Sequence, residues 1–167
     1  MFDPKKILVP TDFSECGGSC SMMAVQKAVS LSQQFGSEII FLHVISEDPY
    51  KKPMFFLDDD KIETILSKMK EASIDELNKI VDNYASDIKD KCKVVIRTGK
   101  PSTEILKETE ESDVDLIVIA SRGLGDVHTA IFGSTTDKII RHAKCSVLVS
   151  RKPNNNHKIK KEVKWKK

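Results

Sequence analysis

Hydrophobic positions form two alternating patterns along the chain, short apolar runs and longer stretches with helical character. The short runs are rich in valine and isoleucine and predict five strands, at residues 6–10, 38–45, 92–97, 115–120 and 146–150. The longer stretches predict four helices, at residues 15–35, 62–88, 102–111 and 134–142. The clearest of these is 62–88, where apolar residues recur at three- and four-residue steps.

The predicted strands are near-continuous apolar runs, as expected where helices cover both faces of a sheet. Alternation of helices with five such strands predicts a single doubly wound α/β domain with a parallel sheet. In sheets of this kind, ligands bind beyond the carboxyl ends of the strands. We therefore expect functional residues directly after Val9, Val44, Arg97 and Ile119.

Two segments do not fit the regular core. Residues 46–61 form a long connection that contains the apolar run Met54–Leu57, which suits a lid, a subunit contact or a segment that folds back onto the domain. The chain from Pro153 onward is rich in asparagine and lysine, a composition typical of disorder. We predict an α/β domain over 1–151 and a basic tail over 152–167.

Composition narrows the class of protein. The 167 residues are 40% hydrophobic and 31% charged, which is ordinary for one globular domain. No apolar run approaches the roughly 18–20 residues that span a bilayer, and the first residues lack the features of a secretion signal. We therefore expect a cytoplasmic protein with no membrane contact.

The net charge of +2 is divided unevenly. Eight basic residues and one acidic residue lie in 151–167, which leaves 19 basic and 24 acidic residues before position 151. Because the domain itself is mildly acidic, we do not predict nucleic-acid binding. The four cysteines match no zinc-binding spacing, so we also predict no metal held directly by protein side chains.

The most informative stretch is 120–135, which leaves the fourth strand and enters the last helix at Gly133-Ser134. Glycines allow the backbone to approach a ligand closely, and a helix start presents unpaired N–H groups. The hydroxyl groups of Ser134 and Thr135 and the charge of Arg122 suit a phosphate group. The spacing matches neither a P-loop nor a dinucleotide fingerprint.

These residues resemble the universal stress protein family, and the likeness covers nearly all of 4–151. Nucleotide-binding members carry Gly-x2-Gly-x9-Gly-(Ser/Thr) after the fourth strand. Here Gly123, nine residues and Gly133-Ser134 match the second half of the motif, and Ala120 replaces its first glycine. The segments Ile7–Ser14 and Leu42–Val44 also resemble the family's first strand with its loop and its second strand.

The resemblance implies a strand order of 3-2-1-4-5 and an ATP site, with ADP or AMP as alternatives and Mg²⁺ or Mn²⁺ on the phosphates. Pro10, Thr11 and Asp12 would line the nucleoside, and the backbone of Val44 would meet adenine.

Gly123, Gly133 and Ser134 would hold the phosphates, assisted by Thr135 and Arg122. Ala120 costs roughly 1 kcal/mol or more if its position requires a positive φ. If the position requires only a small residue, Ala120 is harmless.

The implied function is that of a stress-response regulator that binds ATP, with little or no catalysis. A homodimer through the last strand, Cys145–Ser150, and an unidentified regulatory partner are also implied. Two alternatives are a nucleotide-free interaction module, which Ala120 favours, and a slow ATPase that uses His128 or Asp126. The alternative, purely structural interpretations are that Asp12 caps a helix and that Thr11 only braces a turn.

One further residue has a structural interpretation. His43 lies within a buried strand and is expected to be a packed, hydrogen-bonded core residue.

Overall fold

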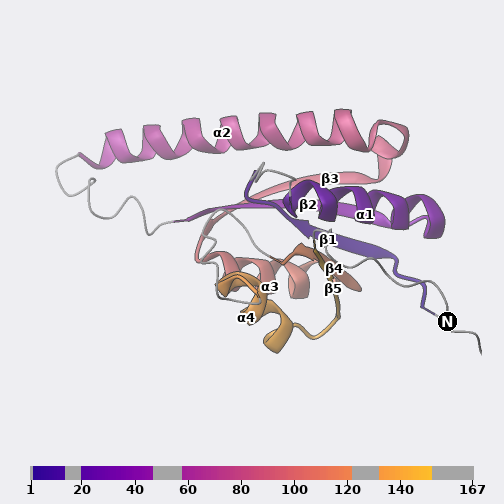
Figure 1. The fold of residues 1–167 in the computed structure, drawn as a ribbon. Helices are drawn as coiled ribbons and strands as arrows, with labels where there is room; N and C mark the ends of the chain where they lie inside the picture. Colours follow the sequence, from indigo (N-terminus) through magenta and orange to yellow (C-terminus); the bar gives the residue numbers. More distant parts are fainter. Residues whose placement is uncertain (1, 14–19, 47–57, 122–131, 152–167) are drawn as a thin grey trace, which may run out of the picture.

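The computed structural model describes residues 2–13, 20–46, 58–121 and 132–151, drawn as a ribbon in Figure 1. Its five strands are β1 (Lys6–Pro10), β2 (Glu38–Ser46), β3 (Cys92–Gly99), β4 (Leu116–Ala120) and β5 (Ser146–Ser150). Its helices are α1 (Cys20–Phe35), α2 (Asp59–Tyr84), α3 (Pro101–Glu111) and α4 (Ser134–His142), with a 3₁₀ helix, η2, at Ser86–Lys91.

All five strands are parallel and lie in the order β3-β2-β1-β4-β5. The chain winds outward from β1 to β2 and β3, then returns to the other side of β1 for β4 and β5. The winding direction therefore reverses between β1 and β4, where the loops that follow the two strands diverge. This topology confirms the doubly wound sheet that the sequence pattern predicts.

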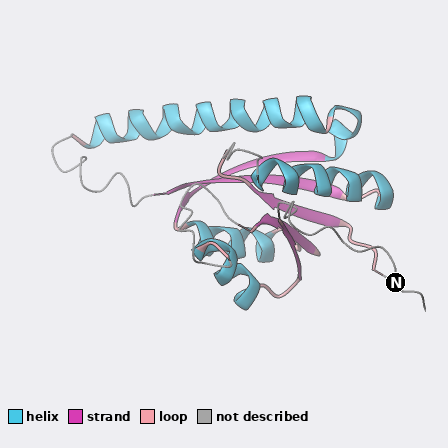
Figure 2. Ribbon diagram, viewed as in Figure 1, coloured by secondary structure: helices cyan, strands magenta, loops and turns pink. Residues whose placement is uncertain are grey.

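Helices cover both faces of the sheet (Figure 2). On one face α1 and α2 bury residues such as Val25 and Leu77, both 0% exposed, against the strands. On the other face α3 and α4 bury Ile105 and Ile139. The central strand β1 contributes to both cores, since Ile7 and Val9 face one layer and Leu8 faces the other. This explains the continuous apolar runs in the sequence.

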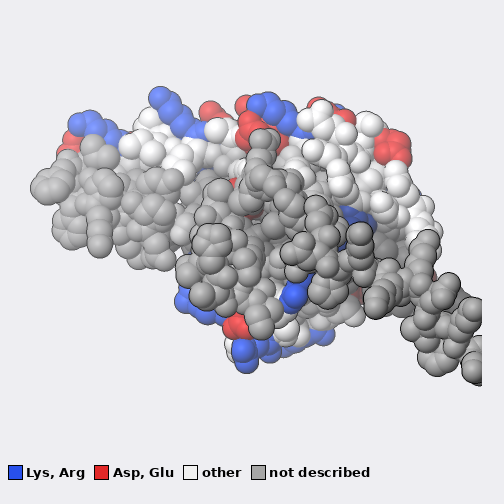
Figure 3. All heavy atoms as spheres, viewed as in Figure 1, with Lys and Arg blue, Asp and Glu red and all other residues white. Residues whose placement is uncertain are grey.

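Helix α2 is longer than the sheet that it covers. Its buried side chains begin at Ser73, and in Figure 1 its first turns extend beyond the strands. Its solvent face carries charges of both signs, as the surface in Figure 3 shows along the top of the molecule. Such a polar face is typical of a surface helix.

Most predicted bounds agree with the structure, and the exceptions have local causes. The helix predicted over 62–88 ends at Tyr84, because Ala85 leaves helical geometry (φ −134°, ψ 24°) and the chain continues as η2. β3 runs two residues past its predicted end, to Gly99. The predicted helix start at Glu15, most of the 46–61 connection and the tail lie outside the described residues.

None of the helices in the described ranges combines the length and apolar character needed to cross a membrane.

Candidate functional site

The residues predicted to line the nucleoside meet at the carboxyl edge of the sheet. β1 pairs with β2 as far as Pro10 with Leu42. On its other side β1 pairs with β4, with Leu8 opposite Ile117, so β4 and β1 end at nearly the same level of the sheet. The strand ends of β2, β1 and β4 therefore lie side by side, as predicted for the doubly wound sheet.

The peptide groups of Val44 point past the end of β1. Successive residues of a strand direct their backbone polar groups alternately toward the two neighbouring strands. The carbonyl of Leu42 accepts a hydrogen bond from the Thr11 N–H at 2.9 Å, so Leu42 faces β1. Val44, two residues on, faces the same way, but β1 pairs with β2 only to Pro10. Among the described residues, the β1–β2 ladder therefore ends before Val44, beside the loop after β1.

Thr11 is held by internal hydrogen bonds. Its side chain is 7% exposed, and its Oγ1 lies 2.6 Å from Ser21 Oγ of α1. The same oxygen accepts the Phe13 N–H at 3.2 Å. A threonine hydroxyl used in this way braces the loop, which matches the structural interpretation of Thr11 offered from the sequence.

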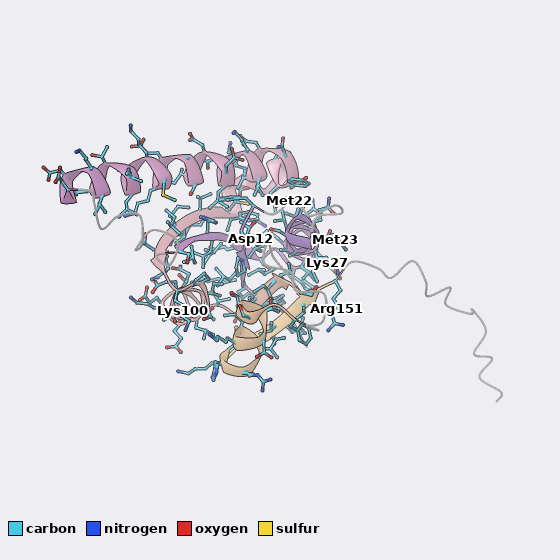
Figure 4. The ribbon with its side chains drawn as sticks, turned by 60° about the vertical axis from the view of Figure 1, so that its left-hand side comes forward. Asp12, Met22, Met23, Lys27, Lys100 and Arg151 are labelled. Atoms are coloured by element: carbon cyan, nitrogen blue, oxygen red, sulfur yellow. The ribbon has the colours of Figure 1, made fainter. Side chains whose placement is uncertain are left out.

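Asp12 lies in the loop that follows β1, two residues after the strand ends at Pro10. In Figure 4 it lies above Lys100, at the start of α3, and Arg151, after β5. Its side chain is half-buried. Its carboxylate acts electrostatically on His43 of β2, where it favours the charged imidazole.

His43 connects β2 to this loop. Its Nδ1 lies 2.9 Å from the carbonyl oxygen of Thr11, and its ring stacks on Phe13 with centroids 4.3 Å apart. Burial lowers the pKa of His43, against the raising effects of the Thr11 hydrogen bond and the Asp12 charge. The prediction that His43 is packed and hydrogen-bonded is confirmed.

Ala120 needs no left-handed backbone. It is the last residue of β4, and the described non-glycine residues with positive φ are Phe13 and Asp113. Its carbonyl accepts a hydrogen bond from the Thr136 Oγ1 at 2.8 Å. Alanine therefore occupies this position without a left-handed backbone.

Helix α4 begins at the same edge. Gly133 is its N-cap, with φ −66° and ψ 157° and no side-chain capping bond. The Asp137 N–H donates to the Gly133 carbonyl at 2.9 Å, so the N–H groups of the three preceding helical residues have no intrahelical acceptor. Ser134 is exposed and Thr135 half-buried. The geometry suits an anion.

Hydrogen bonds connect the residues that flank 122–131 to each other and to β5. The Gly133 N–H donates to the Ser121 carbonyl at 2.9 Å, and the Ser121 N–H donates to the Ser150 carbonyl at 2.8 Å. These bonds tie the start of α4 to the ends of β4 and β5. Arg122 and Gly123, like Asp126 and His128, lie outside the described residues.

Arg151 adds a positive charge that the sequence analysis missed. It directly follows β5, and its guanidinium carbon lies 4.5 Å from the ring centroid of Phe132, next to Gly133. Such a cation–π contact holds the charge near the start of α4. Its position directly after the carboxyl end of the predicted strand 146–150 could have identified Arg151 as a site residue. The sequence analysis grouped Arg151 with the basic residues of the tail instead.

Arg97, beside Val44 in the β2–β3 ladder, ties α3 to β3. Its Nε donates to Glu108 at 2.7 Å, and its other nitrogens contact Glu104 and Glu111. Burial opposes the charge of Arg97, but the hydrogen bonds that Arg97 donates to Glu111 and Glu108 outweigh burial and raise the pKa of Arg97. This cluster is a structural anchor at the far end of the same edge.

The parts of the chain that the structure describes contain no group of three or more histidine, cysteine, aspartate or glutamate side chains able to hold a metal ion.

Comparison with known proteins assigns the family. The Universal stress protein family model matches residues 4–151. Universal stress protein MJ0577 of Methanocaldococcus jannaschii is 30% identical over 161 residues, with 90% of this chain and 97% of that protein covered.

Solved structures agree with the sequence match. Universal stress protein UspA from Lactobacillus plantarum has a TM-score of 0.74 at 26% identity, covering 88% of this chain and 97% of that one. A universal stress protein family protein from Arabidopsis thaliana with AMP bound shares the fold, with a TM-score of 0.61 at 20% identity over 90% and 93% of the two chains. The chain described here belongs to the universal stress protein family.

Proposed function

We propose that this protein is a cytoplasmic stress-response regulator that binds ATP at the carboxyl edge of its sheet, with little or no catalysis. One observation carries the proposal: adjacent strand ends present the backbone of Val44 beyond the β1–β2 ladder, a carboxylate at Asp12 and a helix start at Gly133. These are groups suited to a base, a ribose and phosphates, in that order along the edge. The same fold holds AMP in the Arabidopsis relative.

The nucleoside would lie at the end of β1. The Val44 peptide groups can pair with the adenine edge, and Asp12 can accept a hydrogen bond from a ribose hydroxyl. Pro10 and Thr11 shape this part of the site, Thr11 through bonds that keep its loop in place.

The phosphates would lie at the start of α4. Phosphate oxygens can accept hydrogen bonds from the Ser134 hydroxyl and from the first N–H groups of α4, which have no intrahelical acceptor. By the family resemblance, Gly123, Thr135 and Arg122 would assist, and Arg151 adds a cation that Phe132 holds in place. Hydrogen bonds to a charged group contribute about 1.5–3 kcal/mol each, so several suffice for a Kd near 1 μM, about 8 kcal/mol.

Mg²⁺ or Mn²⁺ would be held by the phosphates, since the described residues offer no carboxylate cluster. When bound there, such a cation neutralises phosphate charge. The protein's own contribution is to hold the nucleotide.

Regulation follows if ATP binds one conformation better than another and so changes contacts with a regulatory partner. We also propose a homodimer through Cys145–Ser150. β5 is an edge strand of the sheet, and such an edge offers unpaired backbone groups. Light scattering on the purified protein should give twice the 18.8 kDa chain mass; a mass of one chain would exclude the dimer.

The test of ATP binding has two parts. The freshly purified protein is denatured and any released nucleotide is identified by chromatography and mass spectrometry. The emptied protein is then titrated with ATP, ADP and AMP, each with Mg²⁺, in a calorimeter. We expect about one nucleotide per chain and micromolar affinity. A protein that is empty as purified and gives no heat with any of the three would refute the proposal.

A further inference from the structure

The loop after β1 contains a backbone conformation that its sequence disfavours. Phe13 has φ +59°, in the left-handed region, where a residue with a large side chain is rarely found. Such conformations persist only where surrounding contacts impose them, and they concentrate at ligand sites. The contacts that impose this one identify the residues that shape the loop.

The loop and α1 supply the first contacts. Thr11 Oγ1 accepts the Phe13 N–H at 3.2 Å, and it shares a hydrogen bond of 2.6 Å with Ser21 Oγ of α1. These bonds close a tight turn whose central residue is Asp12.

Phe13 also packs against the core beneath α1 and α2, and β2 adds contacts through the side chain of His43. Because a carbonyl oxygen only accepts hydrogen bonds, the His43 Nδ1, 2.9 Å from the Thr11 oxygen, carries the proton. The same imidazole stacks on the Phe13 ring, with centroids 4.3 Å apart and planes inclined by 29°. One ring therefore contacts the residue before Asp12 and the residue after it.

We propose that His43 is a positioning residue of the nucleotide site, which holds Asp12 in its binding geometry by contacting Thr11 and Phe13 together. The inference rests on the proposed ATP site. A loop fixed before the ligand arrives loses less conformational freedom on binding, so affinity depends on these contacts even though His43 need not touch the nucleotide.

The test compares two substitutions of His43 in the full-length chain by calorimetric titration with Mg²⁺ and ATP at pH 8. In His43→Asn the side-chain amide nitrogen takes the place of Nδ1 and can still donate to Thr11. In His43→Leu the volume is kept but the donor is lost. We expect ATP to bind about tenfold more weakly to His43→Leu, and His43→Asn to recover affinity to within about threefold of the parent.

Two controls separate positioning from stability. His142→Leu changes an exposed histidine in the last turn of α4, and it should leave ATP affinity unchanged. Leu77→Ala opens a cavity in the α2 core and should lower the unfolding temperature without weakening ATP binding.

The outcomes are distinct. If the parent protein does not bind ATP, the proposed function fails and the inference fails with it. If the parent binds but His43→Leu binds equally well, the ATP site stands and the role of His43 is refuted. Equal losses in His43→Leu and His43→Asn would also refute it, since the hydrogen bond to Thr11 would then be irrelevant.

Discussion

The two edges of the sheet differ in how far their polar groups are bonded within the chain. At the amino edge, the polar groups close bonds within the chain. One oxygen of Asp115 accepts the N–H groups of Lys5 and Lys6, at 2.8 and 2.9 Å. The Ser37 hydroxyl donates to the Pro4 carbonyl at 2.6 Å.

At the carboxyl edge, some backbone groups have no partner within the regular strands and helices that the structure describes. The strand edge at Val44 extends past β1, and the first N–H groups of α4 have no helical acceptor. The proposed ATP site uses backbone groups at the carboxyl edge that have no partner within the regular strands and helices. A matched set of substitutions at the two edges tests this contrast.

The largest effect is expected from Asp12→Ala. Loss of a charge-assisted acceptor in the nucleoside site should weaken ATP binding by about 30- to 100-fold, equivalent to about 2–2.7 kcal/mol. The unfolding temperature should change little, because Asp12 lies in a loop. Titration calorimetry and thermal unfolding measure the two quantities, and parental affinity in the variant would remove Asp12 from the site.

Arg151→Ala should weaken ATP binding by about tenfold and AMP binding by less, because the lost charge acts on the phosphates. The matched control is Arg141→Ala, which removes an exposed arginine of α4 that pairs with Asp137 at 3.0 Å. The difference between Arg151→Ala and the parent should shrink at high salt. An equal loss for ATP and AMP would argue against a phosphate role.

Asp115→Ala reverses the pattern at the amino edge. Two backbone N–H groups lose their acceptor, so the free energy of unfolding should fall by about 1 kcal/mol, while ATP affinity stays at the parental value. Urea unfolding followed by circular dichroism measures the first quantity. A loss of ATP affinity comparable to that of Asp12→Ala would contradict the division between the edges.

The pH dependence of stability should carry a contribution from His43. Its folded-state pKa is lowered, chiefly by burial, so the unfolded chain binds the proton more readily. The contribution is fully present above the unfolded-state pKa of about 6.5 and is lost as pH falls through the lower folded-state pKa. Unfolding free energies measured from pH 8 to pH 5 should drop more for the parent than for His43→Asn; identical profiles would contradict this.

The smallest effect is expected from Ser150→Ala. Among the described residues, the buried Ser150 Oγ has no hydrogen-bond partner, so its removal should leave stability unchanged or raise it by about 0.5–1 kcal/mol. A clear loss of stability in urea unfolding would show that this hydroxyl has a partner in solution.

Much of the architecture follows from the sequence alone. The runs at 6–10 and 146–150 predict β1 and β5 with their observed bounds, because an apolar run bounded by polar residues marks a buried strand. The Gly133-Ser134 spacing likewise locates the start of α4. These features are local, so periodicity and single residue types determine them.

Tertiary structure decided how the site residues are used. The hydroxyls of Thr11 and Thr136 are committed to internal bonds, and Ala120 proves unstrained because it ends a strand. The stacking of Phe13 on His43 and of Arg151 on Phe132 joins residues distant in sequence. These bonds and contacts depend on which strands are neighbours and on where one strand ends beside the next. The sequence pattern alone cannot predict them, because it is a local property of the chain.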